Sequence, residues 1–204
     1  EVLRAGADVI VQARTDEYDE ELLALVREKR PYWTPVMGLG DRSRVCDNDP
    51  FFTQVLSSSL VAEIQAVHCK TDPAAAAARE DGLKRNFQKM IAAGARLVLG
   101  TDAGVYPRYT FGSAEHHEIS MYVRLGLSPA ETIVAATSRA AEALGRADVG
   151  TLAADKSADF LVLDANPLDD IMNTRRIAGV YLRGRRLDRA TLLRQWTQQG
   201  RSSE

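Results

Sequence analysis

The stretch "LVLGTDAGV", residues 97–105, decides how the rest of this sequence is interpreted. Apolar residues that favour β-structure lead into Gly-Thr-Asp-Ala-Gly, so a buried strand is expected to end shortly before Asp102. A polar residue that ends a strand usually serves the turn. In a (β/α) barrel, however, the carboxyl ends of the strands carry the metal-binding and catalytic residues. The pattern on either side of Asp102 has to distinguish between these two interpretations.

Short apolar runs and amphipathic segments alternate through the first 150 residues. The runs predict strands at residues 6–13, 31–36 and 96–101. The amphipathic segments predict helices at residues 16–30, 51–68, 72–94, 116–125 and 128–145. The last of these helices begins with Ser128, Pro129 and Glu131, which form a capping box, and Gly145 is expected to end it. This alternation is typical of a parallel sheet covered by helices.

After Gly150 the pattern changes to bare strands. The runs "ADFLVLD" (158–164) and "IAGVYLRGRRL" (177–187) predict two strands that are not separated by a full helix. We therefore expect residues 1–150 to form an α/β layer, and residues 151–204 to form a small β element with a tail.

Composition narrows the classes of partner. The chain has 204 residues, of which 45% are hydrophobic, and a formal net charge of -2 gives no support to a nucleic-acid or anionic-membrane partner. No apolar run approaches the roughly 20 residues that a membrane-spanning helix needs. Cys46 and Cys69 have no CxxC spacing, so neither a disulfide framework nor a cysteine zinc site is expected. The sequence starts at Glu1 and resembles no signal peptide, which we interpret as a missing N-terminal part that leaves the compartment open.

Several segments, taken in order, resemble the C-terminal portion of the amidohydrolase superfamily, in its imidazolonepropionase-like and prolidase-like branch. "AGADVIVQARTDEYDEELLALVREK" resembles the sixth barrel strand and its helix, "PYWTPV" the seventh strand, and "AAGARLVLGTDAG" the eighth strand with its metal-binding aspartate. "HHEISMYVRLGLSPAETIVAAT" is similar to the HxEL helix and the helix after it. "VGTLAADKSADFLVLDANPLDDI" is similar to the strands that return the chain to a small β-sandwich. The resemblance extends from Glu1 to about Leu187.

The resemblance implies a fold, a cofactor and a site. The fold is α/β: the last strands and helices of a TIM-type (β/α)8 barrel, strands six to eight, plus C-terminal strands of a small β-sandwich. Family members bind one or two divalent metals, usually zinc, and Asp102 matches their metal-binding aspartate on strand eight. The implied role of Asp102 is to hold the metal and to take the proton from the attacking water. The histidine of strand six aligns with Gln12, whose amide oxygen is a poor zinc ligand, and the other ligands of the family lie outside the chain.

Two further residues are candidates for substrate contact. His116 matches the start of the family's HxE motif, here "HHE" with Glu118. Adjacent helix residues point in different directions, so His116 and His117 are not expected to face the same site. We favour local hydrogen bonding of His116 at the start of its helix, with substrate contact as the alternative. Tyr106, in the loop after Asp102, serves either loop packing or the wall of a substrate pocket.

The sequence thus predicts the C-terminal part of a metal-dependent amidohydrolase that cleaves a C–N bond of a small amide, cyclic amide or dipeptide-like substrate. The expected partner is the missing N-terminal half of the barrel, and self-association is left open. The alternative is a degenerate or truncated, non-catalytic barrel segment with a structural or interaction role, because three strands cannot close a barrel. A doubly wound nucleotide-binding domain is disfavoured, since no GxGxxG or GxxxxGK[ST] motif follows a strand.

Overall fold

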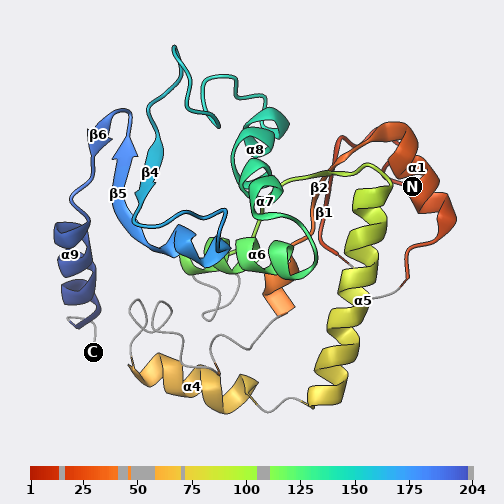
Figure 1. The fold of residues 1–204 in the computed structure, drawn as a ribbon. Coiled ribbons are helices and arrows are strands. Elements are labelled where there is room, and N and C mark those ends of the chain that lie inside the picture. Colours follow the sequence, from red (N-terminus) through yellow and green to blue (C-terminus); the bar gives the residue numbers. More distant parts are fainter. Residues whose placement is uncertain (14–16, 41–45, 47–57, 70–71, 105–110, 202–204) are drawn as a thin grey trace.

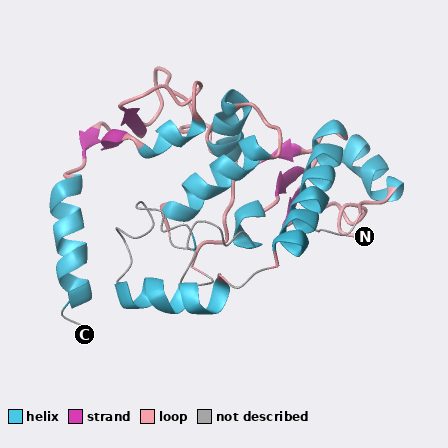
Figure 2. Cartoon of the chain, turned by 60° about the horizontal axis from the view of Figure 1, so that its bottom comes forward, coloured by secondary structure: helices cyan, strands magenta, loops and turns pink. Residues whose placement is uncertain are grey.

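The computed structural model describes residues 1–13, 17–40, 46, 58–69, 72–104 and 111–201. Two sheets lie in this part of the chain, and helices stand between them (Figures 1 and 2). None of the helices in the described ranges combines the length and apolar character needed to cross a bilayer.

The first sheet is parallel and has the strand order β1-β2-β3. Its strands are β1 (Val9–Val11), β2 (Tyr32–Thr34) and β3 (Arg96–Leu97). They fall within the three predicted runs, but β3 is much shorter than the predicted strand at 96–101. The Val98 amide still donates to the carbonyl of Trp33 at 2.8 Å, and the Leu99 amide, which faces away from β2, donates to the carbonyl of Ala135 at 3.0 Å.

Helices α1 (Glu20–Lys29) and α5 (Pro73–Ala92) lie between these strands in sequence, and capping residues set where each helix begins. The carboxylate of Asp19 accepts a hydrogen bond from the Leu22 amide at 2.8 Å, and that of Asp72 accepts one from Ala74 at 2.9 Å. The segment between β2 and α5 adds a short 3-10 helix, η1 (Met37–Gly40), and α4 (Ser58–His68). Helix α4 matches the second half of the predicted helix at 51–68, and residues 51–57 lie outside the described residues.

A row of aromatic side chains forms the centre of the core. Trp33 of β2, Phe87 of α5 and Tyr122 of α6 (Ser113–Arg124) are almost fully buried. The ring centroids of Trp33 and Phe87 lie 5.7 Å apart, and those of Phe87 and Tyr122 lie 5.6 Å apart. The Tyr122 hydroxyl donates to the carbonyl of Val98 at 3.1 Å, which satisfies its polar end. The row therefore fixes α5 and α6 against β2 and against the chain that leaves β3.

The predicted single helix at 128–145 is wrong, because the structure divides it into α7 (Pro129–Ala136) and α8 (Ser138–Ala143). The start is as predicted: Ser128 and Glu131 form a capping box with Pro129 in the first turn. The break lies at Thr137, whose φ of -128° and ψ of -90° are not helical. Gly150 packs onto the break, since a Cβ placed there would lie 2.7 Å from Ala141 Cβ and 3.1 Å from the Thr137 carbonyl oxygen. A tertiary contact with the returning chain thus accompanies the break.

We predict that Gly150→Ala destabilises the protein more than Gly145→Ala. Both glycines have a positive φ, +88° and +65°, but only the Cβ at position 150 meets atoms within 4 Å. Both variants incur the cost of a left-handed residue, and Gly150→Ala adds an overpacking cost of about 1–3 kcal/mol. Urea unfolding of the two variants measures the difference, and equal free energies of unfolding would contradict the proposed packing at the helix break.

The second sheet is antiparallel and has the order β4-β5-β6. It consists of β4 (Phe160–Leu163), β5 (Ile177–Leu182) and β6 (Arg185–Arg186), with the 3-10 helix η2 (Ile171–Arg175) between the first two. The rings of Phe160 and Tyr181 stack at 4.5 Å across the β4–β5 pair. The final segment, expected as a tail, is helix α9 (Arg189–Arg201), which stands beside this sheet (Figure 1).

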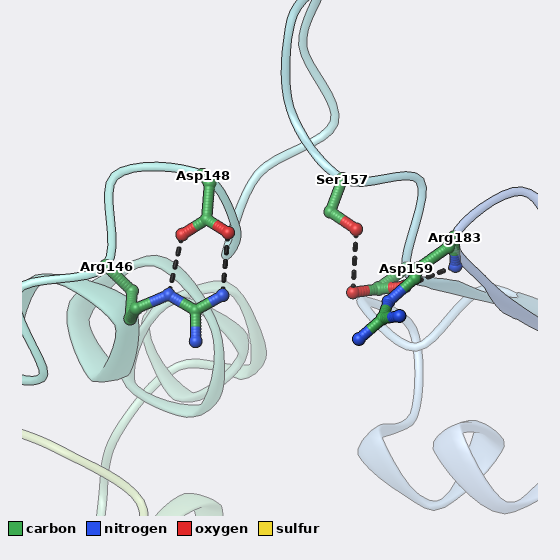
Figure 3. A network of polar contacts seen from close by, with 5 residues as sticks. All are labelled: Arg146, Asp148, Ser157, Asp159 and Arg183. Carbon is green, nitrogen blue, oxygen red and sulfur yellow. Dashed lines mark hydrogen bonds and ion pairs between the residues drawn. The ribbon is translucent and has the colours of Figure 1, made fainter.

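A polar latch connects the end of α8 to the second sheet (Figure 3). The guanidinium of Arg146 donates to both carboxylate oxygens of Asp148, at 2.7 and 2.6 Å. The Asp148 carbonyl accepts from the Ser157 amide at 2.8 Å, and the Ser157 hydroxyl donates to Asp159 at 3.0 Å. Asp159 also accepts from the Arg183 amide at 2.6 Å. The hydrogen bonds from Arg146 lower the pKa of Asp148 to about 2.

We predict that Arg146→Gln raises the pKa of Asp148 from about 2 toward its ordinary 3.8. Because the folded pKa is lowered, the carboxylate stabilises the fold above about pH 4, and this contribution is lost as the pH falls toward about 2. Carboxyl-carbon NMR titration of Asp148 gives the measurement. Lys156→Gln is the control, since Lys156 acts on Asp148 only through its charge and more weakly. An unchanged Asp148 pKa in Arg146→Gln would rule out the latch.

Cys46 and Cys69 form a disulfide, which corrects the expectation from their spacing. Their Cα atoms lie 5.5 Å apart, although 23 positions separate them in sequence. The pairing arises because the chain returns past Cys46 at the end of α4, a tertiary arrangement that spacing does not encode.

Candidate functional site

The candidate site lies at the edge where the three parallel strands end. Gln12 directly follows β1. Its backbone N–H donates to the carbonyl of Thr34, the last residue of β2, at 2.7 Å. Asp102 follows the end of β3, and the side chains of both Gln12 and Asp102 are exposed. The two candidates therefore follow the carboxyl ends of the two outer strands of the sheet, which is where α/β folds place reactive groups.

Left-handed backbone follows every strand of this sheet. Gln12 has a φ of 68°, Val36 a φ of 54° and Asp102 a φ of 55°. Such values are uncommon for any residue other than glycine, and for a β-branched valine they are a clear outlier. Each costs about 1–3 kcal/mol and persists only where the surrounding structure holds it, often at functional sites. Among the described residues, Arg30, Asp155 and Arg183 also have a positive φ, so the backbone supports this edge as a site only together with the position of Asp102 at the strand ends.

The last residue of β2 and the segment after β3 touch at Gly100. A Cβ built there would lie 2.2 Å from the Thr34 methyl carbon, so no larger residue fits without movement. Gly100 stands two positions before Asp102, and Thr34 stands two positions before Val36. This close approach thus ties the two strained turns to each other.

We predict that Gly100→Ala destabilises the protein by about 1–3 kcal/mol, because the new methyl group overlaps Thr34. Thr34→Ser removes the methyl carbon that it meets, so the double variant should be more stable than Gly100→Ala. A double-mutant cycle from denaturant unfolding measures this coupling, with Thr34→Ser as the single-variant control. Strictly additive effects would show that Thr34 and Gly100 do not pack as described.

Glu115 holds both ends of the loop that contains Asp102. Its carboxylate accepts from the hydroxyl of the buried Thr101 at 3.4 Å and from the Gly112 amide at 2.6 Å. The Thr101 hydroxyl in turn accepts from the backbone amide of Ala103 at 3.2 Å. The residues directly before and after Asp102 are therefore hydrogen-bonded to each other. Tyr106, the candidate pocket wall in this loop, lies outside the described residues.

Glu118 performs a role that the sequence analysis missed. Its side chain is fully buried, and its two carboxylate oxygens accept from the amides of Met37 and Gly38, both at 2.6 Å. These amides begin η1, directly after Val36. The "HHE" motif drew attention to this helix, but the partners of Glu118 are about 80 positions away and could not be read from the sequence.

His116 has a hydrogen-bond partner far from the start of its own helix, in addition to the local bonding that we favoured from the sequence. Its Nδ1 lies 3.0 Å from the hydroxyl of Thr174 in η2, so it links α6 to the segment between β4 and β5. Its neighbour His117 is buried, whereas His116 is partly exposed, which agrees with the different directions expected of adjacent helix residues.

The described ranges hold no group of three or more His, Cys, Asp or Glu side chains that could bind a metal ion. Asp102 offers an exposed carboxylate, which suits one oxygen ligand of a divalent metal. Gln12 offers only an amide oxygen, a weaker donor for zinc. Asp102 therefore fits as one ligand of a metal site, and a complete site needs further ligands from elsewhere.

Residues 44–187 match the family model described as Amidohydrolase family, which is more than half of the chain. The chain belongs to the amidohydrolase family. It is 38% identical over 106 residues to an imidazolonepropionase of Deinococcus radiodurans, a match that covers 49% of the chain and 26% of that relative. This amidohydrolase chain thus spans about a quarter of the length of that curated relative. The assignment made from its sequence motifs is confirmed.

Solved structures agree with this membership. A phenylurea hydrolase B is similar with a TM-score of 0.64 and 27% identity, over 92% of the chain and 40% of that structure. A prolidase complexed with N-methylphosphonate-L-proline has a TM-score of 0.63 at 22% identity, over 91% of the chain and 41% of that structure. The second likeness supports the shared fold.

Proposed function

We propose that the chain is the C-terminal part of a metal-dependent hydrolase that cleaves C–N bonds. The observation that carries the proposal is Asp102: an exposed carboxylate in a left-handed turn beyond the carboxyl end of β3, in a member of the amidohydrolase family. The names of its relatives, an imidazolonepropionase and a phenylurea hydrolase, support a small-molecule substrate. The substrate class we propose is an amide, a cyclic amide or a dipeptide-like compound.

In this proposal β1, β2 and β3 are the sixth, seventh and eighth strands of a TIM-type barrel. Their parallel pairing in the order β1-β2-β3 supports it, because consecutive strands of such a barrel are neighbours. Strands β4 to β6 belong to a small β-sandwich, so that residues 1–150 and 151–204 form separate structural parts. The remaining barrel strands come from a portion of the family's length that this chain does not span.

Asp102 is the catalytic residue of the proposal and one ligand of a divalent metal, zinc in the first instance. When bound, such a metal lowers the pKa of water and polarises the scissile carbonyl. The Asp102 carboxylate accepts a proton from the attacking water and returns it to the leaving nitrogen as the C–N bond breaks. Gln12 and His116 are assigned to substrate contact or support of the site, and Tyr106 to the wall of the substrate pocket.

A second candidate function is a non-catalytic barrel segment with a structural or interaction role. One observation favours it: Gln12 stands where the resemblance implies a histidine. Loss of a ligand is what a degenerate metal site would show.

We predict that Asp102→Asn in the full-length protein lowers kcat for amide hydrolysis by at least about 100-fold, because it weakens a ligand and removes the base together. The control is Asp155→Asn, the same substitution at another exposed aspartate with a left-handed φ of 64°. Zinc titration and turnover are measured for this 204-residue chain and for the full-length protein. The chain by itself should bind zinc weakly and lack turnover.

Three results would count against this proposal. Tight stoichiometric zinc binding with turnover by the 204-residue chain would show that it holds a complete site. Unchanged turnover in full-length Asp102→Asn would remove Asp102 from its role. Absence of turnover in the zinc-loaded, full-length wild-type protein would favour the non-catalytic alternative.

A further inference from the structure

Helix α6 carries two glutamates that lie three positions apart, so both project from one side of the helix. Glu115 binds the chain that follows β3, through the Thr101 hydroxyl and the Gly112 amide. Glu118 binds the chain that follows β2, through the amides of Met37 and Gly38. One helix thus holds the turns after two neighbouring strands.

The hydrogen bonds of Glu118 are well suited to hold a backbone in place. A fully buried carboxylate is costly unless it is hydrogen-bonded, and both oxygens of Glu118 accept a backbone N–H at 2.6 Å. Bonds to an ionised acceptor are shorter and stronger than those between neutral groups. The first amides of a helical turn also need acceptors from outside it. Glu118 and the start of η1 therefore satisfy each other.

The amides that Glu118 binds come directly after the strained residue Val36. A valine with a φ of 54° relaxes unless its neighbours hold it. Fixing the Met37 and Gly38 amides removes the freedom through which this turn would relax. The last residue of β2, Thr34, two positions before Val36, packs against Gly100 in the segment that leads to Asp102.

We propose that Glu118 is a positioning residue for the hydrolysis: it sets the turn after β2 and, together with Glu115, fixes that turn relative to Asp102. The catalytic part of this inference rests on the function proposed above. Glu118 acts through the backbone amides that it binds and does not itself take part in the reaction.

Two substitutions separate the reach of the side chain from its charge. Glu118→Gln keeps the length but places an NH2 group against one backbone N–H, so that one hydrogen bond is lost. Glu118→Asp keeps the charge but withdraws the carboxylate by one methylene, about 1.5 Å. The positioning role requires both reach and acceptor oxygens, so both variants should be impaired. Glu131→Gln is the matched control, because the exposed Glu131 carboxylate accepts from the Ser128 amide at 3.0 Å at the start of α7.

The first measurement is amide hydrogen exchange at Met37 and Gly38 in the 204-residue chain. We expect exchange there to speed up about tenfold or more in Glu118→Gln and in Glu118→Asp, as the loss of a charged hydrogen bond predicts. In Glu131→Gln these two amides should exchange as in the wild type. Wild-type protection at Met37 and Gly38 in either Glu118 variant would overturn the proposal.

The second measurement is kinetic and uses the full-length protein loaded with zinc. Both Glu118 variants should lose about 10- to 100-fold in kcat with little change in KM, since misplacement of about 1 Å in a site has effects of this size. Glu131→Gln should keep the wild-type kcat. A wild-type kcat in Glu118→Gln, or an equal loss in Glu131→Gln, would overturn the positioning role.

The two measurements distinguish failure of this inference from failure of the proposed function. If the full-length wild-type protein hydrolyses no amide, the proposed function fails and the catalytic part of the inference fails with it. Hydrogen exchange still decides whether Glu118 sets the turn after β2. If turnover is present but exchange at Met37 and Gly38 is insensitive to Glu118, the inference fails while the proposed function stands.

Discussion

The packing of Trp33, Phe87 and Tyr122 is the interaction on which the rest of this structure depends. It brings β2, α5 and α6 together in one core, with centroid separations of 5.7 and 5.6 Å. The polar atoms at the two ends of the row then reach the chain at the strand ends. Trp33 Nε1 donates to the carbonyl of Gln12 at 3.1 Å, and the Tyr122 hydroxyl donates to that of Val98. The side chains that bury apolar surface therefore also bind the first residues after β1 and β3.

Local signals in the sequence predicted much of the fold. Apolar runs located β1 and β2, and the capping box at Ser128 marked the start of α7. The predictions failed where distant contacts compete with local preference. Helix 128–145 breaks at Thr137, and strand 96–101 is shorter than predicted, with the Leu99 amide bonded to the carbonyl of Ala135 in α7. Neither partner is encoded by periodicity within the segment.

For the candidate site, too, local features could be predicted from the sequence and long-range contacts could not. The location of Asp102 after a strand could be read from "LVLGTDAGV", because the residues that encode it are adjacent. The contacts of α6 could not be read, since Glu118 meets Met37 and His116 meets Thr174 across 81 and 58 positions. A glutamate within a helical pattern ordinarily signals a solvated face. Only the folded arrangement shows that Glu118 is buried against two backbone amides.

Several of these contacts hold the left-handed residues at the edge where the parallel strands end. Each left-handed residue there is held by hydrogen bonds on itself or on the residues beside it: Gln12 through its own amide and carbonyl, Val36 through Glu118, and Asp102 through the Thr101 hydroxyl. Three such conformations cost several kcal/mol together, at about 1–3 kcal/mol each. Backbone that is held in this way suits the proposed hydrolysis, in which the side chains at this edge have to stand in set positions before a ligand arrives.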